Sequence, residues 1–184
     1  MLFYRAALDL SPASRRLVAG LVREHRRRIG SRWRALPPER QALLALVHLR
    51  RNETFPAPAA AFGVGLATAH RYVTEVVELL AALAPDLRQA MRIAARKAHV
   101  TLDGTPVPID RLSGTDDRLF FSGKHRRHGV NIQFLTDPHG RLIRASAALP
   151  GSTHDLTAAR VHGIVDALAR WAIACYADKG IHRR

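Results

Sequence analysis

Apolar residues in the first hundred positions recur at helical spacing, and no part of this stretch shows the period-two alternation of a strand. Ser11 followed by Pro12 is a helix start, and Gly30 is a helix end. We expect four helices, over residues 12–29, 38–52, 58–62 and 66–83. The first would bury Leu17, Val18, Leu21, Val22 and Ile29, and the last Leu66, Ala69, Val73, Val76, Val77, Leu80 and Leu83.

The third and fourth of these helices are joined by a tight turn, Phe62-Gly63-Val64-Gly65, which makes a helix-turn-helix pattern. The early turns of the last helix expose short polar and basic side chains of the types that reach base edges and phosphates: Thr68, His70, Arg71 and Thr74. Glu75 and Glu78 follow where they would face away from DNA. The pattern predicts DNA binding, and a plain helical bundle with solvated basic faces is the alternative.

Near Ala98 the pattern changes to short β-type runs. We expect a strand over residues 99–102 that ends at Asp103-Gly104, and then an extended piece over 107–109. Residues 130–135 and 141–149 form a hairpin closed by the turn Asp137-Pro138-His139-Gly140. Asp155 is expected to cap a helix that contains Gly163, and residues 171–177 form a buried strand. This order predicts a mixed sheet with a crossing helix.

The charge of the chain favours a polyanionic partner. Its 184 residues include 29 Lys and Arg against 15 Asp and Glu, a formal net charge of +14 with a pI near 11.5. Residues 1–100 carry 17 basic and 7 acidic side chains, so the front half accounts for +10 of this charge. Nucleic acid is the first expectation. A GC-rich genome, which favours arginine, is the alternative cause, since only three of the 29 are lysines.

Two other properties narrow the class of protein. The single cysteine, Cys175, excludes an internal disulfide and a cysteine-based zinc cluster. The apolar stretches are too short and interrupted to span a bilayer, and the first residues lack the charged region and cleavage site of a signal peptide. We therefore expect a cytoplasmic protein without a membrane partner.

Two carboxylates follow apolar strands in the back half. Asp103 and Asp178 each come at the carboxyl end of such a strand, with a glycine one or two positions later. Ligands bind at strand ends in open α/β sheets, and two carboxylates brought together there repel unless a cation lies between them. Mg²⁺ meets this need, and a pair of such ions supports phosphodiester cleavage. The alternative is that each Asp-Gly is only a turn.

The loop between these acids is basic. Lys124, His125, Arg126 and Arg127 stand in succession and are followed by His128. Such a loop grips phosphates or is simply a solvated turn, and we expect the first.

Six short motifs occur in a fixed order: Leu102-Asp103-Gly104-Thr105, Ser122-Gly123-Lys124-His125, Asn131-Ile132-Gln133, Asp137-Pro138-His139-Gly140, Pro150-Gly151-Ser152-Thr153-His154-Asp155 and Ala177-Asp178-Lys179-Gly180. This series resembles the DDE superfamily endonucleases of bacterial insertion sequences, the group akin to the Harbinger transposases. The resemblance covers roughly residues 35–180. It implies an α+β fold: an all-α helix-turn-helix domain at residues 1–95, with the motif at about 38–84, followed at 96–184 by part of an RNase H-like mixed α/β core.

The resemblance also implies site residues and partners. Asp103 and Asp178 match the first two catalytic, metal-binding acids, which would use two Mg²⁺ or Mn²⁺ ions, and the DNA partner would be the double-stranded ends of a transposon. A glutamate on a later helix completes the family's set, yet no glutamate follows Glu78 in this sequence. We therefore expect a truncated transposase, inactive alone, that acts as a homodimer or is complemented by a downstream-encoded C-terminal part.

Two other functions remain open. A truncated product could occupy transposon ends through its helical half and repress the full enzyme. An unrelated RNase H-like nuclease would need its own third acid, for which only Asp110, Asp116, Asp117 and Asp137 are available.

Overall fold

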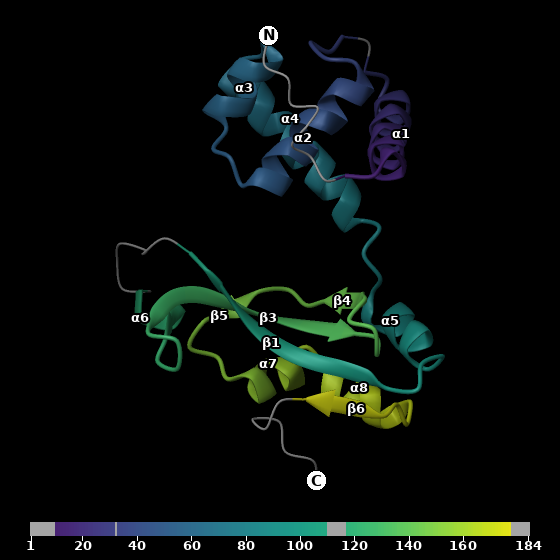
Figure 1. The fold of residues 1–184 in the computed structure, drawn as a ribbon, viewed down its shortest axis with the longest axis vertical. Helices are drawn as coiled ribbons and strands as arrows, with labels where there is room; N and C mark the ends of the chain where they lie inside the picture. Colours follow the sequence, from purple (N-terminus) through teal and green to yellow (C-terminus); the bar gives the residue numbers. More distant parts are fainter. Residues whose placement is uncertain (1–9, 32, 110–116, 178–184) are drawn as a thin grey trace. The chain divides into compact units, whose positions relative to one another are not determined.

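The chain divides into two compact units, Met1–Ala84 and Pro85–Arg184. The structure is a computed structural model that describes residues 10–31, 33–109 and 117–177 (Figure 1). Each unit has its own cluster of buried apolar side chains, and no residue belongs to both clusters. Within the described residues, no helix is both long enough and apolar enough to cross a membrane.

The described residues of the first unit form four helices, as the sequence predicts: α1 (Pro12–Arg28), α2 (Pro38–Arg51), α3 (Pro56–Phe62) and α4 (Leu66–Ala81). The Ser11 hydroxyl caps α1 by accepting a hydrogen bond from the backbone N–H of Ser14 at 3.1 Å. The left-handed residues Asn52 and Gly63, with φ of 51° and 67°, end α2 and α3. The turn after Gly63 leads into α4 and completes the helix-turn-helix.

The core of the first unit contains fewer of the apolar helix residues than the sequence pattern predicts. Val18 and Val22 of α1 and Val76 of α4 are buried against α2, where Leu44 and Val47 are fully buried. Five residues expected inside are exposed instead: Leu17, Ile29, Leu66, Val77 and Leu83. They lie at helix ends or beside the contact face, where no neighbouring helix covers them.

Within the described part of the second unit, six strands form one mixed sheet: β1 (Val100–Pro108), β2 (Phe121–Ser122), β3 (Arg127–Thr136), β4 (Leu142–Ala145), β5 (Leu149–Pro150) and β6 (Cys175–Ala177). The long strands β1 and β3 pair antiparallel from Thr101–Thr136 to Pro108–Gly129. The other edge of β3 carries β2, β4 and β5, all antiparallel, and β6 pairs parallel to β1. The hairpin of β3 and β4 confirms the one expected from the sequence.

Helices cover one side of this sheet (Figure 1). Helix α5 (Leu87–Ala94) packs on β4 and α8 (Ile164–Arg170), while α7 (Asp155–Val161) packs on β3. Their side chains enclose Leu102 and Leu135. The short helix α6 (Asp117–Phe120) leads into β2. The chain thus has a helical unit followed by a mixed sheet, in which β1 and β3 pair antiparallel and β6 joins β1 in parallel. This arrangement belongs to the α+β class and has an RNase H-like core.

Several local expectations differ from this structure. Strand β1 continues unbroken through Asp103-Gly104 to Pro108, because β3 pairs with it over its whole length. Gly163, with a φ of 66°, separates α7 from α8, so the single helix expected after Asp155 is two helices. The strand expected over residues 171–177 is limited to β6.

Helix α5 has no counterpart among the helices predicted from the sequence. A capping box starts this helix just after the end of the first unit. In it, the side chains of Asp86 and Gln89 each accept a hydrogen bond from the other's backbone N–H. Because Ala90, Met91 and Ala94 are buried in the second core, the contacts group this helix with the sheet. From the sequence, these residues were predicted to belong to the helical domain at residues 1–95.

Candidate active site and DNA-binding surface

Asp103 lies on β1 at the point where the parallel pairing with β6 ends. The last described pair of that ladder is Leu102 with Ala177, and Asp103 follows Leu102 in the sequence as Asp178 follows Ala177. The Asp103 side chain is exposed. Among the described residues it has neither a hydrogen bond nor an ion pair. Asp178, the second expected acid, lies outside the described residues.

An exposed carboxylate without a protein partner keeps both oxygens available for a cation. Hard oxygen donors are the ligands that Mg²⁺ and Mn²⁺ prefer, so Asp103 fits such an ion. Among the described residues, no group of three or more His, Cys, Asp or Glu side chains forms a metal-binding cluster. The described chain therefore contributes one of the two carboxylates that the sequence analysis assigned to the site.

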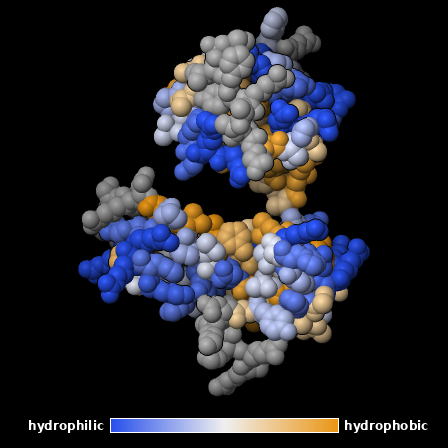
Figure 2. Space-filling model, viewed as in Figure 1, coloured by the Kyte–Doolittle hydropathy of each residue, from blue (hydrophilic) through white to orange (hydrophobic). Residues whose placement is uncertain are grey.

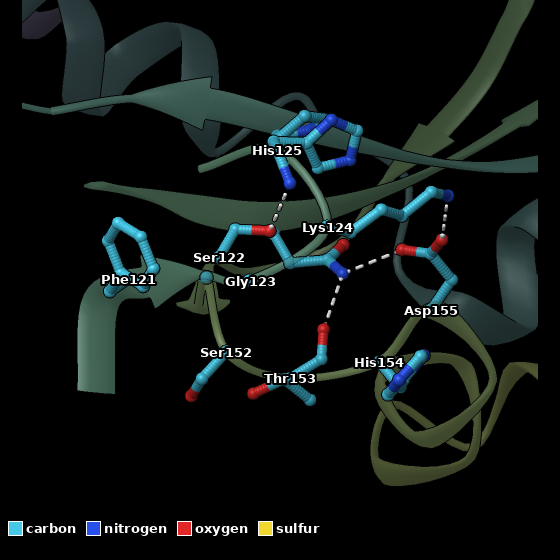
Figure 3. A pocket seen from close by; sticks show the side chains of 12 residues that line it. Phe121, Ser122, Gly123, Lys124, His125, Ser152, Thr153, His154 and Asp155 are labelled. Atoms are coloured by element: carbon cyan, nitrogen blue, oxygen red, sulfur yellow. Dashed lines mark hydrogen bonds and ion pairs between the residues drawn. The ribbon is translucent and has the colours of Figure 1, made fainter. Parts of the chain in front are cut away.

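A polar pocket lies on the helix-covered side of the sheet, between the loop after β2 and the loop before α7 (Figure 3). Its volume is about 280 Å³. Two of the motifs form most of its wall, the stretch from Ser122 to His125 and the stretch from Gly151 to Asp155, and Asn131 of a third motif completes it. Residues far apart in the sequence thus meet at one place.

A hydrogen-bonded network runs through this pocket to the sheet (Figure 3). The Asn131 amide donates to the Asp155 carboxylate at 2.7 Å and to the Thr153 carbonyl at 2.9 Å. Gln133 donates to the Asn131 side-chain oxygen at 2.8 Å. The Lys124 ammonium lies 3.8 Å from the other Asp155 oxygen. Asp155 lines the pocket and is the first residue of α7. It is not the helix cap expected from the sequence, because His154 occupies the cap position.

Gly104 explains why a glycine follows Asp103. A Cβ at position 104 would lie 2.5 Å from the Asp155 carboxyl carbon, closer still to one of its oxygens, and 2.7 Å from the Gln133 amide nitrogen. Only a residue without a side chain lets the Asp155 carboxylate rest against the β1 backbone there. The Asp-Gly pair thus belongs to a strand and not to a turn.

Asn131, Gln133 and Asp155 are parts of the site that were not predicted from the sequence. A signal existed for the first two. Asn131 and Gln133 alternate in phase with Leu135, which is fully buried, so they are polar residues on the covered face of a strand. Buried polar side chains need partners, and such a pair predicts a network. Nothing comparable marked Asp155.

The basic loop presents four exposed side chains: Lys124, His125, Arg126 and Arg127. Lys124 and His125 line the pocket, whereas Arg126 and Arg127 are not part of its wall. The backbone N–H of His125 donates to the Ser122 hydroxyl at 3.4 Å, and Arg126 adopts a left-handed φ of 50°. The loop is therefore a defined turn in which Lys124 reaches toward Asp155 at the pocket, while Arg126 and Arg127 are exposed outside the pocket wall.

Four residues of α4 were predicted to contact DNA. His70, Arg71 and Thr74 are exposed, and Thr68 is half-buried. The His70 ring lies 4.9 Å from the ring of Phe55, which in turn stacks on His48 at 4.5 Å. Glu75 is buried and pairs with Arg34 at 2.9 Å, whereas Glu78 is exposed. That both residues face away from DNA stays a prediction.

Two family models match the chain. Residues 34–86 match the helix-turn-helix of DDE superfamily endonucleases, and residues 102–182 match the DDE superfamily endonuclease domain. The first segment spans α2 to α4, and the second begins one residue before Asp103. Neither the search of curated proteins nor the search of solved structures gave a match.

Proposed function

Since the chain belongs to the DDE superfamily endonucleases, we propose that it binds transposon ends and serves their metal-dependent cleavage and strand transfer. The domains of this family act on DNA and generally use divalent metal ions. The observation that carries the proposal is the exposed carboxylate of Asp103, which has no partner among the described residues and directly follows the Leu102–Ala177 pair of β1 and β6.

Asp103 and Asp178 are the metal ligands in this proposal. The register supports it, because each acid directly follows a member of the Leu102–Ala177 pair. When bound, a pair of Mg²⁺ or Mn²⁺ ions supplies an activated water or 3′-hydroxyl and stabilises the leaving oxygen. The contribution of the chain is a sheet in which β1 carries Asp103 and the neighbouring strand β6 has Ala177, the residue before Asp178, as its last described position.

The DNA contacts of the proposal come from both units. Helix α4 is the recognition helix, with Thr68, His70, Arg71 and Thr74 directed to base edges and phosphates in the major groove. In the second unit, the exposed loop Lys124–Arg127 binds the DNA backbone next to the catalytic strands. Phosphate contacts position the duplex, and base contacts select the site.

The 184 residues contain no glutamate after Glu78, so they hold two of the three acids that the resemblance implies. In our proposal these residues alone lack strand-transfer activity, and the missing acid comes from a further segment or a partner chain, in a homodimer or a complemented enzyme. A second candidate function follows from the same observation. A DNA-binding chain without cleavage activity occupies transposon ends and represses transposition.

Metal binding tests the site directly. We expect the purified chain to bind Mn²⁺, measured by electron paramagnetic resonance, and Asp103→Asn to weaken that binding strongly. Asp166→Asn is the matched control, because Asp166 is an exposed acid on α8 and belongs to neither strand of the β1–β6 pair. Equal binding by the two variants would refute the role of Asp103.

DNA binding and cleavage separate the two candidate functions. A gel-shift assay in rising salt should show binding of transposon-end DNA that Arg71→Ala weakens. Binding without Mg²⁺-dependent nicking supports the repressor, and nicking that Asp103→Asn abolishes supports the enzyme. If no DNA is bound even at low salt, both candidates fail.

A further inference from the structure

A groove lined by arginines lies between α1 and α2 of the helical unit. Its volume is about 610 Å³, and its polar wall consists of Arg15, Arg16, Arg23, Glu39 and Arg40. Helix α1 lies before residue 34, where the matched helix-turn-helix segment begins, so the family match does not account for the α1 side of this groove. The surface over α1 is strongly hydrophilic (Figure 2).

The groove carries an excess of positive charge. Four arginines against one glutamate leave a formal charge of +3. Glu39 forms an ion pair with Arg23, and both side chains stay more than half exposed, at 59% and 61%. Among the described residues, Arg15 and Arg16 have no acidic partner. Their charges are therefore available to an anion.

The three arginines on α1 do not contribute to the core of the unit. Helix α1 packs into the core through Val18, Ala19 and Val22, while Arg15, Arg16 and Arg23 are exposed. Arg16 and Arg23 are seven residues apart, so they lie on nearly the same face about 10 Å apart along the helix axis. A row of cationic groups on this scale matches an extended polyanion better than a small ligand.

Contacts within the unit tie the groove to the helix-turn-helix. The Arg40 guanidinium lies 5.8 Å from the centre of the Phe62 ring, at the end of α3. The next residue, Gln41, donates to the backbone carbonyl of Tyr72 on α4 at 3.4 Å. Because these helices share one core, the distance between the groove and the recognition helix is set by the fold.

We propose that the groove of Arg15, Arg16, Arg23 and Arg40 binds the phosphodiester backbone of the DNA that α4 reads. This inference rests on the proposed DNA-binding function and adds α1 as a second, sequence-independent contact. Phosphate contacts of this kind raise affinity for all sequences and fix the orientation of the protein on the duplex.

Fluorescence anisotropy of the full chain on a labelled duplex of about 30 base pairs, roughly three helical turns, tests the inference. Each phosphate contact contributes about 0.9 to the slope of log affinity against log salt concentration. Arg15→Ala/Arg16→Ala should reduce the magnitude of that slope by about 1.8. At about 0.1 M salt it should weaken binding by about tenfold or more, equally for transposon-end and unrelated duplexes.

Two further variants make the result specific. Arg15→Lys/Arg16→Lys retains the charges and should retain most of the affinity. Arg160→Ala/Arg170→Ala removes the same charge from exposed sites on α7 and α8, and its salt slope should equal that of the wild type. Circular dichroism confirms that each variant is folded.

The outcomes separate this inference from the proposed function. If the wild type binds and Arg71→Ala weakens it, while Arg15→Ala/Arg16→Ala keeps the wild-type slope, the groove is not a DNA contact and the proposed function stands. A slope lowered equally in Arg160→Ala/Arg170→Ala would overturn the inference as a nonspecific effect of net charge. If the wild type binds no DNA, the proposed function fails first.

Discussion

The buried ion pair of Glu75 and Arg34 allows a quantitative prediction about the helical unit. The two side chains are 9% and 14% exposed, and their charged atoms are 2.9 Å apart. At an effective dielectric constant of about 20, the gross attraction is about 6 kcal/mol, and the cost of removing both charges from water offsets part of it. The Arg34 guanidinium also donates to the Ser31 hydroxyl at 2.7 Å.

We predict that Glu75→Ala destabilises the helical unit by about 3 kcal/mol, because it leaves the buried Arg34 charge without a carboxylate, beside the Ser31 hydroxyl and the face of the Tyr72 ring. For a unit of 84 residues, this loss lowers Tm by roughly 12–24 °C. Thermal unfolding of the full chain, followed by far-ultraviolet circular dichroism, measures the shift.

Glu24→Ala is the matched control. Glu24 pairs with Arg27 on the surface of α1, where both side chains are more than 60% exposed. Surface pairs of this kind contribute about 0–1 kcal/mol, so Tm should change by only a few degrees. Replacing the buried pair together, as Arg34→Met/Glu75→Leu, should recover most of the stability. A Glu75→Ala shift no larger than that of Glu24→Ala would show that the pair does not stabilise the unit.

Three further predictions concern the second unit. Gly104→Ala should destabilise it by about 1–3 kcal/mol in urea unfolding, because the added methyl group displaces the Asp155 carboxylate; an unchanged midpoint would contradict this packing. Burial raises the pKa of Asp137, but hydrogen bonds from Arg141, Lys97 and His139 outweigh it, and the net pKa is lowered. Asp137→Asn should therefore destabilise at pH 7, and the difference from wild type should shrink as pH falls below 3.8, the ordinary pKa, and vanish once pH passes the lowered pKa of the folded state; a difference that does not shrink on acidification would refute it. Gly163→Ala places a side chain at a φ of 66° and should cost about 1–2 kcal/mol by the same urea assay, whereas a gain would contradict the left-handed break between α7 and α8.

The first four helices could be predicted because their boundaries carry local signals. Ser11-Pro12 starts α1, Pro38 starts α2, and Gly63 ends α3, and each acts through backbone geometry that depends on few neighbours. Helix α5 has only eight residues, and its buried side chains are mostly alanine, so its periodicity was weak. Its capping box was the signal that could have revealed it.

The candidate site was predictable only in part. The position of Asp103 after an apolar run identified it as an acid on a strand, and the described register supports that placement. The role of Asp155 depends on Gly104 and Asn131, which lie on other elements, and no local pattern encodes that contact. Asp178 stays a prediction, since it lies outside the described residues.

The division of the chain at Ala84 and Pro85 has a consequence for how such proteins diversify. Because each unit buries its own set of apolar side chains, a substitution in one core leaves the packing of the other unchanged. Recognition of a new DNA sequence can therefore arise by mutation or exchange of the helical unit while the carboxylate-bearing sheet keeps its geometry. With this architecture, the recognition of a DNA sequence and the proposed cleavage of DNA can evolve at separate rates within one polypeptide.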